Sequence, residues 1–249
     1  MANRLKDKRI VITGAVNNIG KEAAGLFVEE GARVCIGDID EKAGQTTAKE
    51  LGATFVKVDV TREEAVKTFI EHAVATLGGL DVLVQNAGLQ RSGQVTGFQA
   101  SDWDALFAVN SRAHFFGAKY AVPHIRQAGK GSIINTSSLA GQRGGPGLTA
   151  YSASKGAVIA FSTALAMELA PDNIRVNAIC PGWVDTAFNQ PAIDFMGGRA
   201  TQEEVVRRIV PLRRQAQPHE IAPLFVYLAS DESSYVTAQA ITIDGGVYN

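Results

Sequence analysis

The sequence has little of what marks secreted, metal-binding or membrane proteins. Its 249 residues include two cysteines, Cys35 and Cys180, which lie in apolar runs, as buried reduced thiols do, and show no metal-ligand spacing. No run approaches the roughly 20 apolar residues of a membrane-spanning helix. The charged start MANRLKDKRI lacks the apolar stretch of a signal peptide. We therefore expect a protein of the reducing cytoplasm with no membrane partner and no metal.

An excess of charge of either sign is also missing. The chain carries 24 Lys and Arg against 25 Asp and Glu, a net charge of −1. Such a balance provides no basic surface for nucleic acid or acidic lipid. What the chain does have is 46% hydrophobic and 20% charged residues, which suffices for a sizeable core. Its length fits one α/β domain over residues 1–249.

Short β-branched runs alternate with amphipathic segments along the whole chain. Continuous apolar strands between such helices indicate a parallel sheet with helices on both faces. Right-handed crossovers then give a doubly wound, Rossmann-like α/β fold. We expect strands at 9–13, 32–38, 54–60, 80–88, 132–138, 174–180 and 240–246. We expect helices at about 18–30, 41–51, 62–78, 102–127, 150–169 and 218–229.

The alternation is interrupted between residues 185 and 218. This stretch places Pro191, Gly197, Gly198 and Pro211 around one helical piece. Long irregular stretches in compact domains are usually lids or binding loops. We expect a substrate-binding lid here, with a surface insertion of no function as the alternative.

The first strand leads into a turn that suits a phosphate group. The segment TGAVNNIG (13–20) has glycine only at Gly14 and Gly20, so it lacks the G-x-G-x-x-G spacing. The physics is similar, because a turn without Cβ atoms lets the backbone approach a pyrophosphate at a helix N-terminus. Taken alone, the two glycines are also compatible with a turn that merely connects a strand to a helix.

Asp38 stands at the end of the second strand, where a dinucleotide-binding fold holds the adenosine ribose. A carboxylate there accepts hydrogen bonds from both ribose hydroxyls and repels a 2′-phosphate. The residues in reach are Asn17 and Ile39 rather than Arg or Lys. The sequence therefore predicts NAD in preference to NADP.

Tyr151 and Lys155 are four residues apart in an expected helix and so share one of its faces. A tyrosine with its ordinary pKa of about 10 is a poor base at neutral pH. A fixed ammonium nearby favours the phenolate and lowers that pKa, so the pair can move a proton. The same spacing also arises by chance in many helices.

Two polar residues add context to this pair. Ser138 ends the preceding strand at the carboxyl edge of the sheet, where doubly wound sheets bind ligands, and its hydroxyl can hold a substrate oxygen. Asn110 lies inside, or at a bend of, the helix that follows the fourth strand. Asn is mildly unfavourable within a helix, which indicates a role, and a satisfied structural amide is the alternative.

Together these segments resemble the short-chain dehydrogenases/reductases in their common single-domain form. Their order and spacing are far more specific than any one segment, and the resemblance covers essentially the whole chain. The matching segments are TGAVNNIG (13–20), Asp38, Asp59-Val60, QNAG (85–88), Asn110, INTSS (134–138), YSASK (151–155), RVNAICPG (175–182) and AITIDGG (240–246).

The resemblance implies a catalytic tetrad. Asn110 would hold a water in a proton relay, Ser138 would orient the substrate oxygen, and Tyr151 would exchange the hydroxyl proton. Lys155 would bind the nicotinamide ribose and lower the tyrosine pKa. The implied NAD-binding residues are Gly14, Asn17, Asn18, Ile19, Gly20, Asp38, Ile39, Asp59, Val60, Asn86, Ala87, Gly88, Tyr151, Lys155, Pro181, Gly182, Val184 and Thr186.

Two residues depart from the family pattern. Asn18 stands where the family usually has a third glycine, and Asn is the non-glycine residue that best tolerates a positive φ, so we expect the turn to persist. Gln85 stands where the family usually has Asn in its NNAG motif. We expect this change to loosen a stabilising hydrogen bond and to leave the chemistry in place.

The sequence thus predicts an NAD(H)-dependent oxidoreductase that interconverts a sugar, polyol or other small secondary alcohol and its ketone. The expected substrate contacts are Ser138, Ala140, Gln142, Tyr151, Trp183 and Phe188. A 3-oxoacyl-carrier-protein-type ketoreductase is the alternative, although such enzymes typically use NADPH and Asp38 argues against it. A lyase of the halohydrin-cleaving type would lack the cofactor turn and carry Arg at Lys155. A non-catalytic cofactor-binding protein would usually lack a tetrad residue.

The resemblance further implies a homotetramer, built by pairing the long helices expected at about 102–127 and 150–169. Small residues would permit close helix contact, namely Ala153, Gly156, Ala157, Ala160 and Ala164. A helix packed on its own sheet has the same composition, so the sequence leaves both arrangements open.

Overall fold

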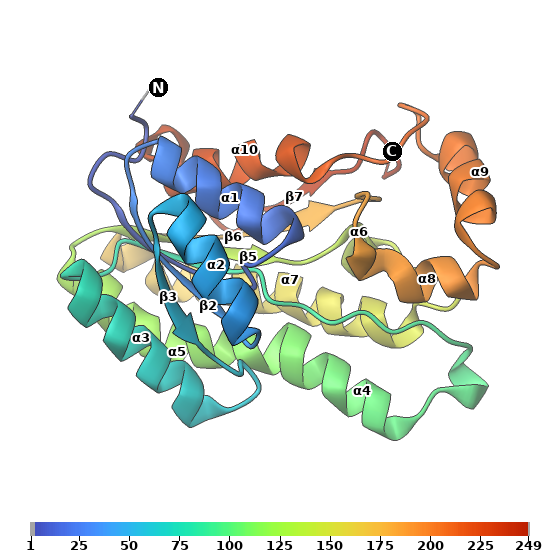
Figure 1. Ribbon diagram of the computed structural model, residues 1–249, viewed down its shortest axis with the longest axis horizontal. Coiled ribbons are helices and arrows are strands. Elements are labelled where there is room, and N and C mark those ends of the chain that lie inside the picture. The colour runs from blue at the N-terminus through green and yellow to red at the C-terminus, as the bar shows by residue number, and fades with distance from the viewer. Residues whose placement is uncertain (1–2, 249) are drawn as a thin grey trace.

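A seven-stranded parallel sheet forms the centre of the molecule, with helices on both faces (Figure 1). The computed structural model describes residues 3–248. The strand order is β3-β2-β1-β4-β5-β6-β7, and every neighbouring pair is parallel. The strands are β1 (Arg9–Thr13), β2 (Arg33–Asp38), β3 (Thr54–Lys57), β4 (Val82–Gln85), β5 (Gly131–Thr136), β6 (Ile174–Pro181) and β7 (Ala240–Ile243). The expected doubly wound fold is confirmed.

The winding direction reverses between β1 and β4, which lie side by side in the middle of the sheet. The chain first moves outward from β1 to β2 and β3, then returns to β4 and continues to β7. Doubly wound sheets bind ligands at the carboxyl ends of the strands at this switch point. The interior of β1 is fully buried, as a strand covered on both faces must be, and consists of Ile10, Val11 and Ile12.

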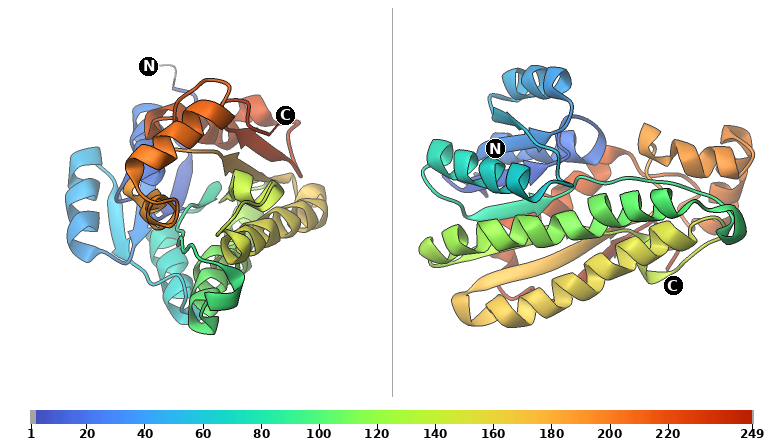
Figure 2. Two further views of the ribbon diagram at one scale, coloured as in Figure 1. Left: turned by 90° about the vertical axis from the view of Figure 1, so that its right-hand side faces the viewer. Right: turned by 90° about the horizontal axis from the view of Figure 1, so that it is seen from below.

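Two helical layers cover the sheet. One contains α1 (Asn18–Glu29), α2 (Glu41–Leu51) and α10 (Pro218–Ala229), whose apolar residues form a single cluster with one face of the sheet. The other contains α3 (Glu63–Leu77), α5 (Ala113–Gln127) and α7 (Thr149–Leu169), which form a second cluster on the opposite face. The helical run that ends with α5 lies beside α7 in this second layer (Figure 2).

The expected helix at about 102–127 is two α-helices joined by a π-helical turn. The elements are α4 (Ala100–Phe107), the turn Ala108–Arg112 and then α5. A π-turn inserts an extra residue into the helical repeat and is common at functional sites. Asn110 lies in this turn, within the helical run in which the sequence places it.

Several segments differ from the expected boundaries. β3 and β4 are shorter than the runs 54–60 and 80–88, because the residues after Lys57 and Gln85 leave the ladder to form loops at the carboxyl edge. The region 185–218 contains a short 3₁₀-helix (Ala187–Asn189) and two α-helices rather than one, α8 (Gln190–Phe195) and α9 (Arg199–Ile209). They are separated by Gly197 and Gly198, both with positive φ. Figure 1 shows them at the end of the molecule beyond the carboxyl ends of the strands.

Among the described residues, one helical stretch, 149–172, is long and apolar enough to cross a membrane by length and composition alone. It contains α7, which packs on β6. Cys35 and Cys180 are buried and free, as expected. Residues 3–248 contain no cluster of three or more side chains suited to a metal ion.

Candidate active site

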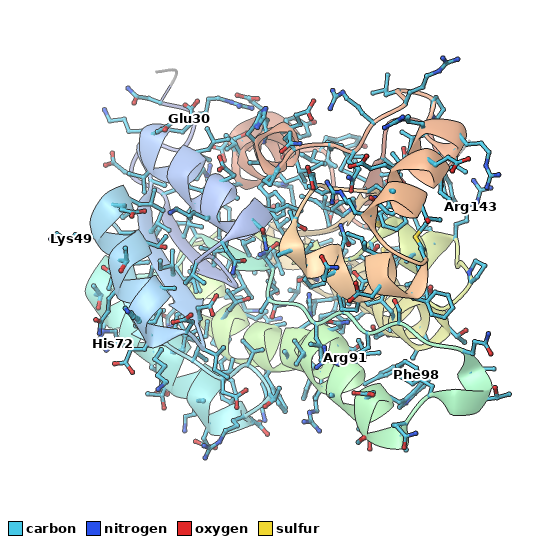
Figure 3. All side chains as sticks on the ribbon, turned by 45° about the vertical axis from the view of Figure 1, so that its right-hand side comes forward. Glu30, Lys49, His72, Arg91, Phe98 and Arg143 are labelled. Atoms are coloured by element: carbon cyan, nitrogen blue, oxygen red, sulfur yellow. The ribbon has the colours of Figure 1, made fainter. Side chains whose placement is uncertain are left out.

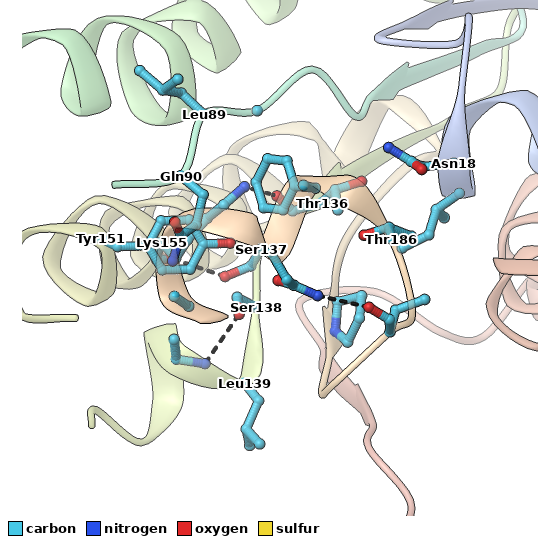
Figure 4. A pocket seen from close by; sticks show the side chains of 18 of the residues that line it. Asn18, Leu89, Gln90, Thr136, Ser137, Ser138, Leu139, Tyr151, Lys155 and Thr186 are labelled. Carbon is cyan, nitrogen blue, oxygen red and sulfur yellow. Dashed lines mark hydrogen bonds between the residues drawn. The ribbon is translucent and has the colours of Figure 1, made fainter. Parts of the chain in front are cut away.

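A cavity of about 1180 Å³ opens at the carboxyl ends of β1, β2, β4, β5 and β6 (Figure 4). It lies at the switch point of the sheet, where the fold predicts a ligand. Most of the site residues expected from the sequence line it. These are Gly14, Asn17, Asn18, Ile19, Asp38, Ile39, Asp59, Val60, Asn86, Ala87, Gly88, Ser138, Ala140, Tyr151, Lys155, Pro181, Gly182, Trp183, Val184, Thr186 and Phe188.

Three expected residues do not line the cavity: Gly20, Asn110 and Gln142. Gln142 belongs to the short helix α6 (Leu139–Gln142) and turns toward β7. Its Nε2 donates to the Ala240 carbonyl at 3.3 Å, and its Oε1 accepts from Thr242 Oγ1 at 2.8 Å. The expectation that Gln142 contacts substrate therefore needs correction, because its carboxamide is engaged by a neighbouring strand.

The turn after β1 packs tightly against the start of the loop after β4. A Cβ on Gly14, which has a φ of 67°, would lie 2.6 Å from Ala87 Cα. A Cβ on Gly20 would collide with the Gly14 carbonyl oxygen. Asn86 Nδ2 donates to that oxygen at 2.8 Å and joins the two loops. Gly20 thus shapes the turn from inside, while Gly14 forms part of the cavity wall.

Asn18 keeps the turn in the conformation that glycine would give. Its φ is 49°, in the left-handed region that Asn tolerates better than other side chains, so the expected survival of the turn is confirmed. Its Nδ2 donates to Asn17 Oδ1 at 2.9 Å. The side chain lines the cavity beside the N-terminus of α1 (Figure 4).

Asp38 lies half-buried in the wall at the end of β2. Burial raises the pKa of its carboxyl above the usual value, while backbone N–H groups, among them that of Asp40, lower it. The Asp40 N–H donates to Asp38 Oδ1 at 3.1 Å. The adjacent Ile39 is 62% exposed and adds no positive charge. The lining residues at this end of β2, Gly37, Asp38 and Ile39, thus supply a carboxylate and no basic side chain.

Gln85 keeps its hydrogen bonds although it replaces the family's usual Asn. Its Nε2 donates to Asn135 Oδ1 at 2.9 Å and to the His114 carbonyl at 3.0 Å. The extra methylene extends the amide to α5, and Gly117 leaves room for it, since a Cβ there would collide with Gln85 Oε1. The expected loosening is therefore not seen.

Tyr151 and Lys155 face the cavity from the first turns of α7. Both side chains are buried, Tyr151 being 7% and Lys155 2% exposed. Lys155 Nζ donates to the Thr136 carbonyl at 2.8 Å and lies 6.0 Å from the centre of the Tyr151 ring. An ammonium has three N–H donors, so two remain for a ligand. Ser138 follows β5, and its Oγ caps α6 by accepting from the Ala140 N–H at 3.1 Å.

The protonation of this pair differs from expectation. Burial raises the pKa of Tyr151 to about 12, and a hydrogen bond with Ser138 lowers it by less. Burial also lowers the pKa of Lys155 to about 8. The sequence predicts a lowered tyrosine pKa, whereas burial, the largest cause here, raises it. The phenol is therefore protonated at neutral pH.

Asn110 supports the site from behind the cavity wall. Its Oδ1 accepts from the Leu89 N–H at 2.7 Å, while its Nδ2 donates to the Leu89 carbonyl at 2.9 Å and to Ser154 Oγ at 3.0 Å. The side chain is fully buried. Its carboxamide thus ties the loop after β4 to α7, as a satisfied structural amide does.

The residues present fit a nicotinamide dinucleotide. The two unused N–H donors of Lys155 could bind the hydroxyls of one ribose. The Asp38 carboxylate could accept hydrogen bonds from the hydroxyls of the other, elsewhere in the same cavity. The Gly14 turn presents backbone beside the N-terminus of α1, as a pyrophosphate requires. Cofactor binding would depend on these three features.

A family model described as "Enoyl-(Acyl carrier protein) reductase" matches residues 14–248. The chain belongs to the short-chain dehydrogenase/reductase family. It is 41% identical to a 3-oxoacyl-[acyl-carrier-protein] reductase of Thermotoga maritima, over 98% of this chain and 99% of that protein. It is 36% identical to a cyclopentanol dehydrogenase of Comamonas testosteroni, over 98% of each. The crystal structure of levodione reductase superposes with a TM-score of 0.93 at 27% identity, over 97% of each chain.

Membership of this family makes the chain an oxidoreductase that acts on CH–OH or keto groups. The lining of the cavity also includes residues that sequence reasoning did not assign to a site, among them Leu89, Gln90 and Leu148. Their loops have no periodicity and carry no motif, so no sequence signal distinguished them. Phe195 and Met196, from the expected lid, line the cavity as well.

Proposed function

We propose that this short-chain dehydrogenase/reductase interconverts a secondary alcohol and its ketone with NAD(H). The observation that carries the proposal is one cavity that holds Tyr151, Ser138 and Lys155 together with the Gly14 turn and Asp38. The first three can handle an oxygen and its proton, and the last two can hold a dinucleotide beside it. Either set without the other would leave the reaction incomplete.

Tyr151 is the group that we assign to proton transfer. A bound nicotinamide would supply the hydride transfer to the carbonyl carbon or from the carbinol carbon. In reduction, the Tyr151 phenol gives its proton to the carbonyl oxygen, and the C=O bond becomes CH–OH. In oxidation, the phenolate takes the hydroxyl proton as the C–H bond breaks. Ser138 holds the reacting oxygen, and Lys155 stabilises the phenolate by its charge.

The rate of alcohol oxidation is expected to rise with pH. The pKa of Tyr151 is raised to about 12, so the phenol is the main form in the neutral range and the phenolate is scarce. Below its pKa, each pH unit upward increases the phenolate about tenfold, and oxidation needs the phenolate. Values of kcat/KM from initial rates between about pH 6 and 7.5, below the Lys155 pKa of about 8, will check this. An oxidation rate that falls as pH rises would exclude Tyr151 as the base.

Cofactor choice is expected to depend on Asp38 and Ile39. Asp38→Ala combined with Ile39→Arg removes a carboxylate that repels a 2′-phosphate and adds a cation that binds one. The ratio of kcat/KM for NADP to that for NAD should rise by at least about a hundredfold, because both charge changes act on the same 2′-phosphate. Glu41→Ala, an exposed change nearby, serves as the control. A wild type that already prefers NADPH would refute the assignment of Asp38.

The substrate that we propose is a compact secondary alcohol such as a polyol or a ring alcohol. Phe188, Phe195 and Met196 give the cavity apolar walls, and one relative is named for a ring alcohol, cyclopentanol. Reduction of a 3-oxoacyl thioester is the second candidate, since a protein of that name is 41% identical to the chain. Rates with an acetoacetyl thioester and NADPH, set beside rates with alcohols and NAD, distinguish the two.

We further propose that the protein assembles as a homotetramer through α7 and the helices beside it. Ala153, Ala160, Ala164 and Met167 lie on the exposed side of α7, with Met167 72% exposed. Phe115 on α5 is 49% exposed. Apolar surface of this kind is what a second copy would cover. Location in the cytoplasm stays a prediction from the sequence.

A further inference from the structure

The two ends of the cavity differ in charge. Its acidic lining residues, Asp38 and Asp59, follow β2 and β3, at one edge of the sheet. Arg143 and Arg208 line the cavity from segments that follow β5 and β6, on the other half of the sheet. Among residues 3–248, no carboxylate joins these two arginines in the lining of their end. A cleft lined by charge of one sign concentrates ions of the opposite sign, so this end favours an anion.

Both arginines keep their charge available to a ligand. Among residues 3–248, neither guanidinium forms an ion pair, whereas other arginines of the same region do, namely Arg199, Arg207 and Arg214. Arg143 is exposed, and its Nη1 donates to a backbone carbonyl, which uses one of five N–H donors. Arg208 is exposed as well. A guanidinium binds the oxygens of a carboxylate or phosphate in pairs, so each group suits an anion from outside the chain.

The C-terminal segment links the two arginines. Arg208 lies on the face of α9 that lines the cavity. The residue after α9 contacts the C-terminal segment, since a Cβ on Gly245 would lie 2.8 Å from Val210 Cγ1. The same segment accepts the hydrogen bond from Arg143, at the Val247 carbonyl. Figure 3 labels Arg143 on the side of the molecule where the orange α9 lies. Both arginines therefore belong to one part of the cavity.

This part of the cavity is continuous with the proton-transfer residues. Ser138 caps the start of α6, and Arg143 follows its end, where the Arg143 N–H donates to the Leu139 carbonyl at 2.8 Å. Five residues along a helix span roughly 8 Å, which sets the separation of the Ser138 and Arg143 backbones. Most of the loop 144–148, which leads from Arg143 back to Tyr151, lines the cavity as well. A substrate whose oxygen lies at Ser138 and Tyr151 therefore has room to extend to Arg143.

We propose that Arg143 and Arg208 bind an anionic group of the substrate, a carboxylate or a phosphate, remote from the reacting carbon. The preferred substrates are then secondary alcohols that carry this anion several bonds from the carbinol carbon, and the matching ketones. The apolar side chains of Leu148 and Phe188, which line the cavity, suit the carbon frame between the two ends. This inference rests on the proposed function, since it names the substrate class of the same site.

The kinetic test compares three 4-substituted cyclohexanols in the presence of NAD. They carry a carboxylate, a phosphate monoester or a neutral carboxamide, which matches the carboxylate in size. Sites that pair with a substrate group reject analogues without it, so wild-type kcat/KM for one of the anions should exceed that for the carboxamide by at least about tenfold. The better anion shows whether the site takes a carboxylate or a phosphate.

Variants of the two arginines then test their part in this preference. Arg208→Met should lower the ratio of kcat/KM for the better anion to that for the carboxamide by at least about threefold. With Arg143→Met added, the ratio should fall to about one. Arg207→Met is the matched control, because Arg207 is the next residue on α9, exposed, paired with Glu203 and outside the cavity. It should keep the wild-type ratio.

A binding measurement separates this inference from the proposed function. Calorimetry with Tyr151→Phe and bound NAD gives the Kd of each anion without turnover, with and without Arg208→Met. An increase in Kd of at least about threefold on Arg208→Met supports the inference even if no alcohol is oxidised, in which case only the proposed function fails. Equal Kd values, or no measurable binding of either anion, overturn the inference.

Two further outcomes would also overturn it. Equal wild-type kcat/KM for the anions and the carboxamide would leave the proposed function standing without an anion site. A loss of NAD affinity on Arg208→Met, with the ratio for the alcohols unchanged, would assign Arg208 to the cofactor instead of the substrate.

Discussion

Replacing Tyr151 by Phe is expected to lower kcat by about a thousandfold, within the range that a positioned acid or base contributes. Among residues 3–248, Tyr151 supplies the only phenol that lines the cavity, and burial holds its proton at neutral pH. Phe keeps the ring and its packing against Phe188, whose ring centre lies 6.3 Å away. Initial rates of alcohol oxidation and ketone reduction will measure the loss.

The same variant is expected to bind NAD with a Kd within about twofold of wild type, because the phenol oxygen contributes to the chemistry more than to cofactor binding. Tyr235→Phe provides the matched control, since Tyr235 is fully exposed and should leave both rates unchanged. Turnover of Tyr151→Phe near the wild-type rate would show that another group transfers the proton.

Replacing Lys155 by Met is expected to lower kcat/KM by at least about a hundredfold and to weaken NAD binding as well. Met has a similar length and suits a buried site, so the fold should persist while the charge and three N–H donors are lost. The loss of charge removes the stabilisation of the phenolate, and the loss of donors removes contacts to the ribose. Kinetics and calorimetric titration with NAD will measure the two effects separately.

Lys119→Met is the matched control for this change, because Lys119 lies on the outer side of α5 in an ion pair with Glu63 and should leave activity intact. A Lys155→Met protein that binds NAD as wild type does would contradict the assignment of Lys155 to the ribose. Circular dichroism of each variant checks that the fold is retained.

Much of the fold could be predicted because its determinants are local. Each buried strand is a short apolar run, as in residues 9–13, and each flanking helix shows one apolar face, as in 62–78. The π-helical turn at Asn110 could not be predicted, because the partners of Asn110, Leu89 and Ser154, lie in two other elements. The split into α8 and α9 depends on two positive-φ glycines that the sequence placed within one irregular stretch.

The candidate cofactor site could be predicted largely because its residues follow directly on the strands. Gly14 and Asp38 come at the carboxyl ends of β1 and β2, and parallel strands bring these ends together. Gln142 could not be placed this way, since its orientation is set by β7, a hundred residues later.

The protonation of Tyr151 illustrates a second limit. The four-residue spacing to Lys155 indicates a nearby positive charge, and charge alone lowers the pKa of a phenol. The extent of burial of both groups depends on the packing of α7 against the loops after β4 and β5, which the sequence does not specify. Burial proved to be the larger cause, so the direction of the shift is opposite to the expected one.

Reduction of NAD by a secondary alcohol is the reaction on which the proposed function depends. Wild type is mixed with NAD or NADP and a panel of secondary alcohols that includes diols and ring alcohols, and the absorbance of the reduced cofactor is followed. We expect reduction of the cofactor with at least one alcohol. Because Asp38 repels a 2′-phosphate, the rate with NAD should exceed the rate with NADP by at least about tenfold. Turnover with NADP and none with NAD would contradict the account, as would the absence of turnover with either cofactor across the whole panel.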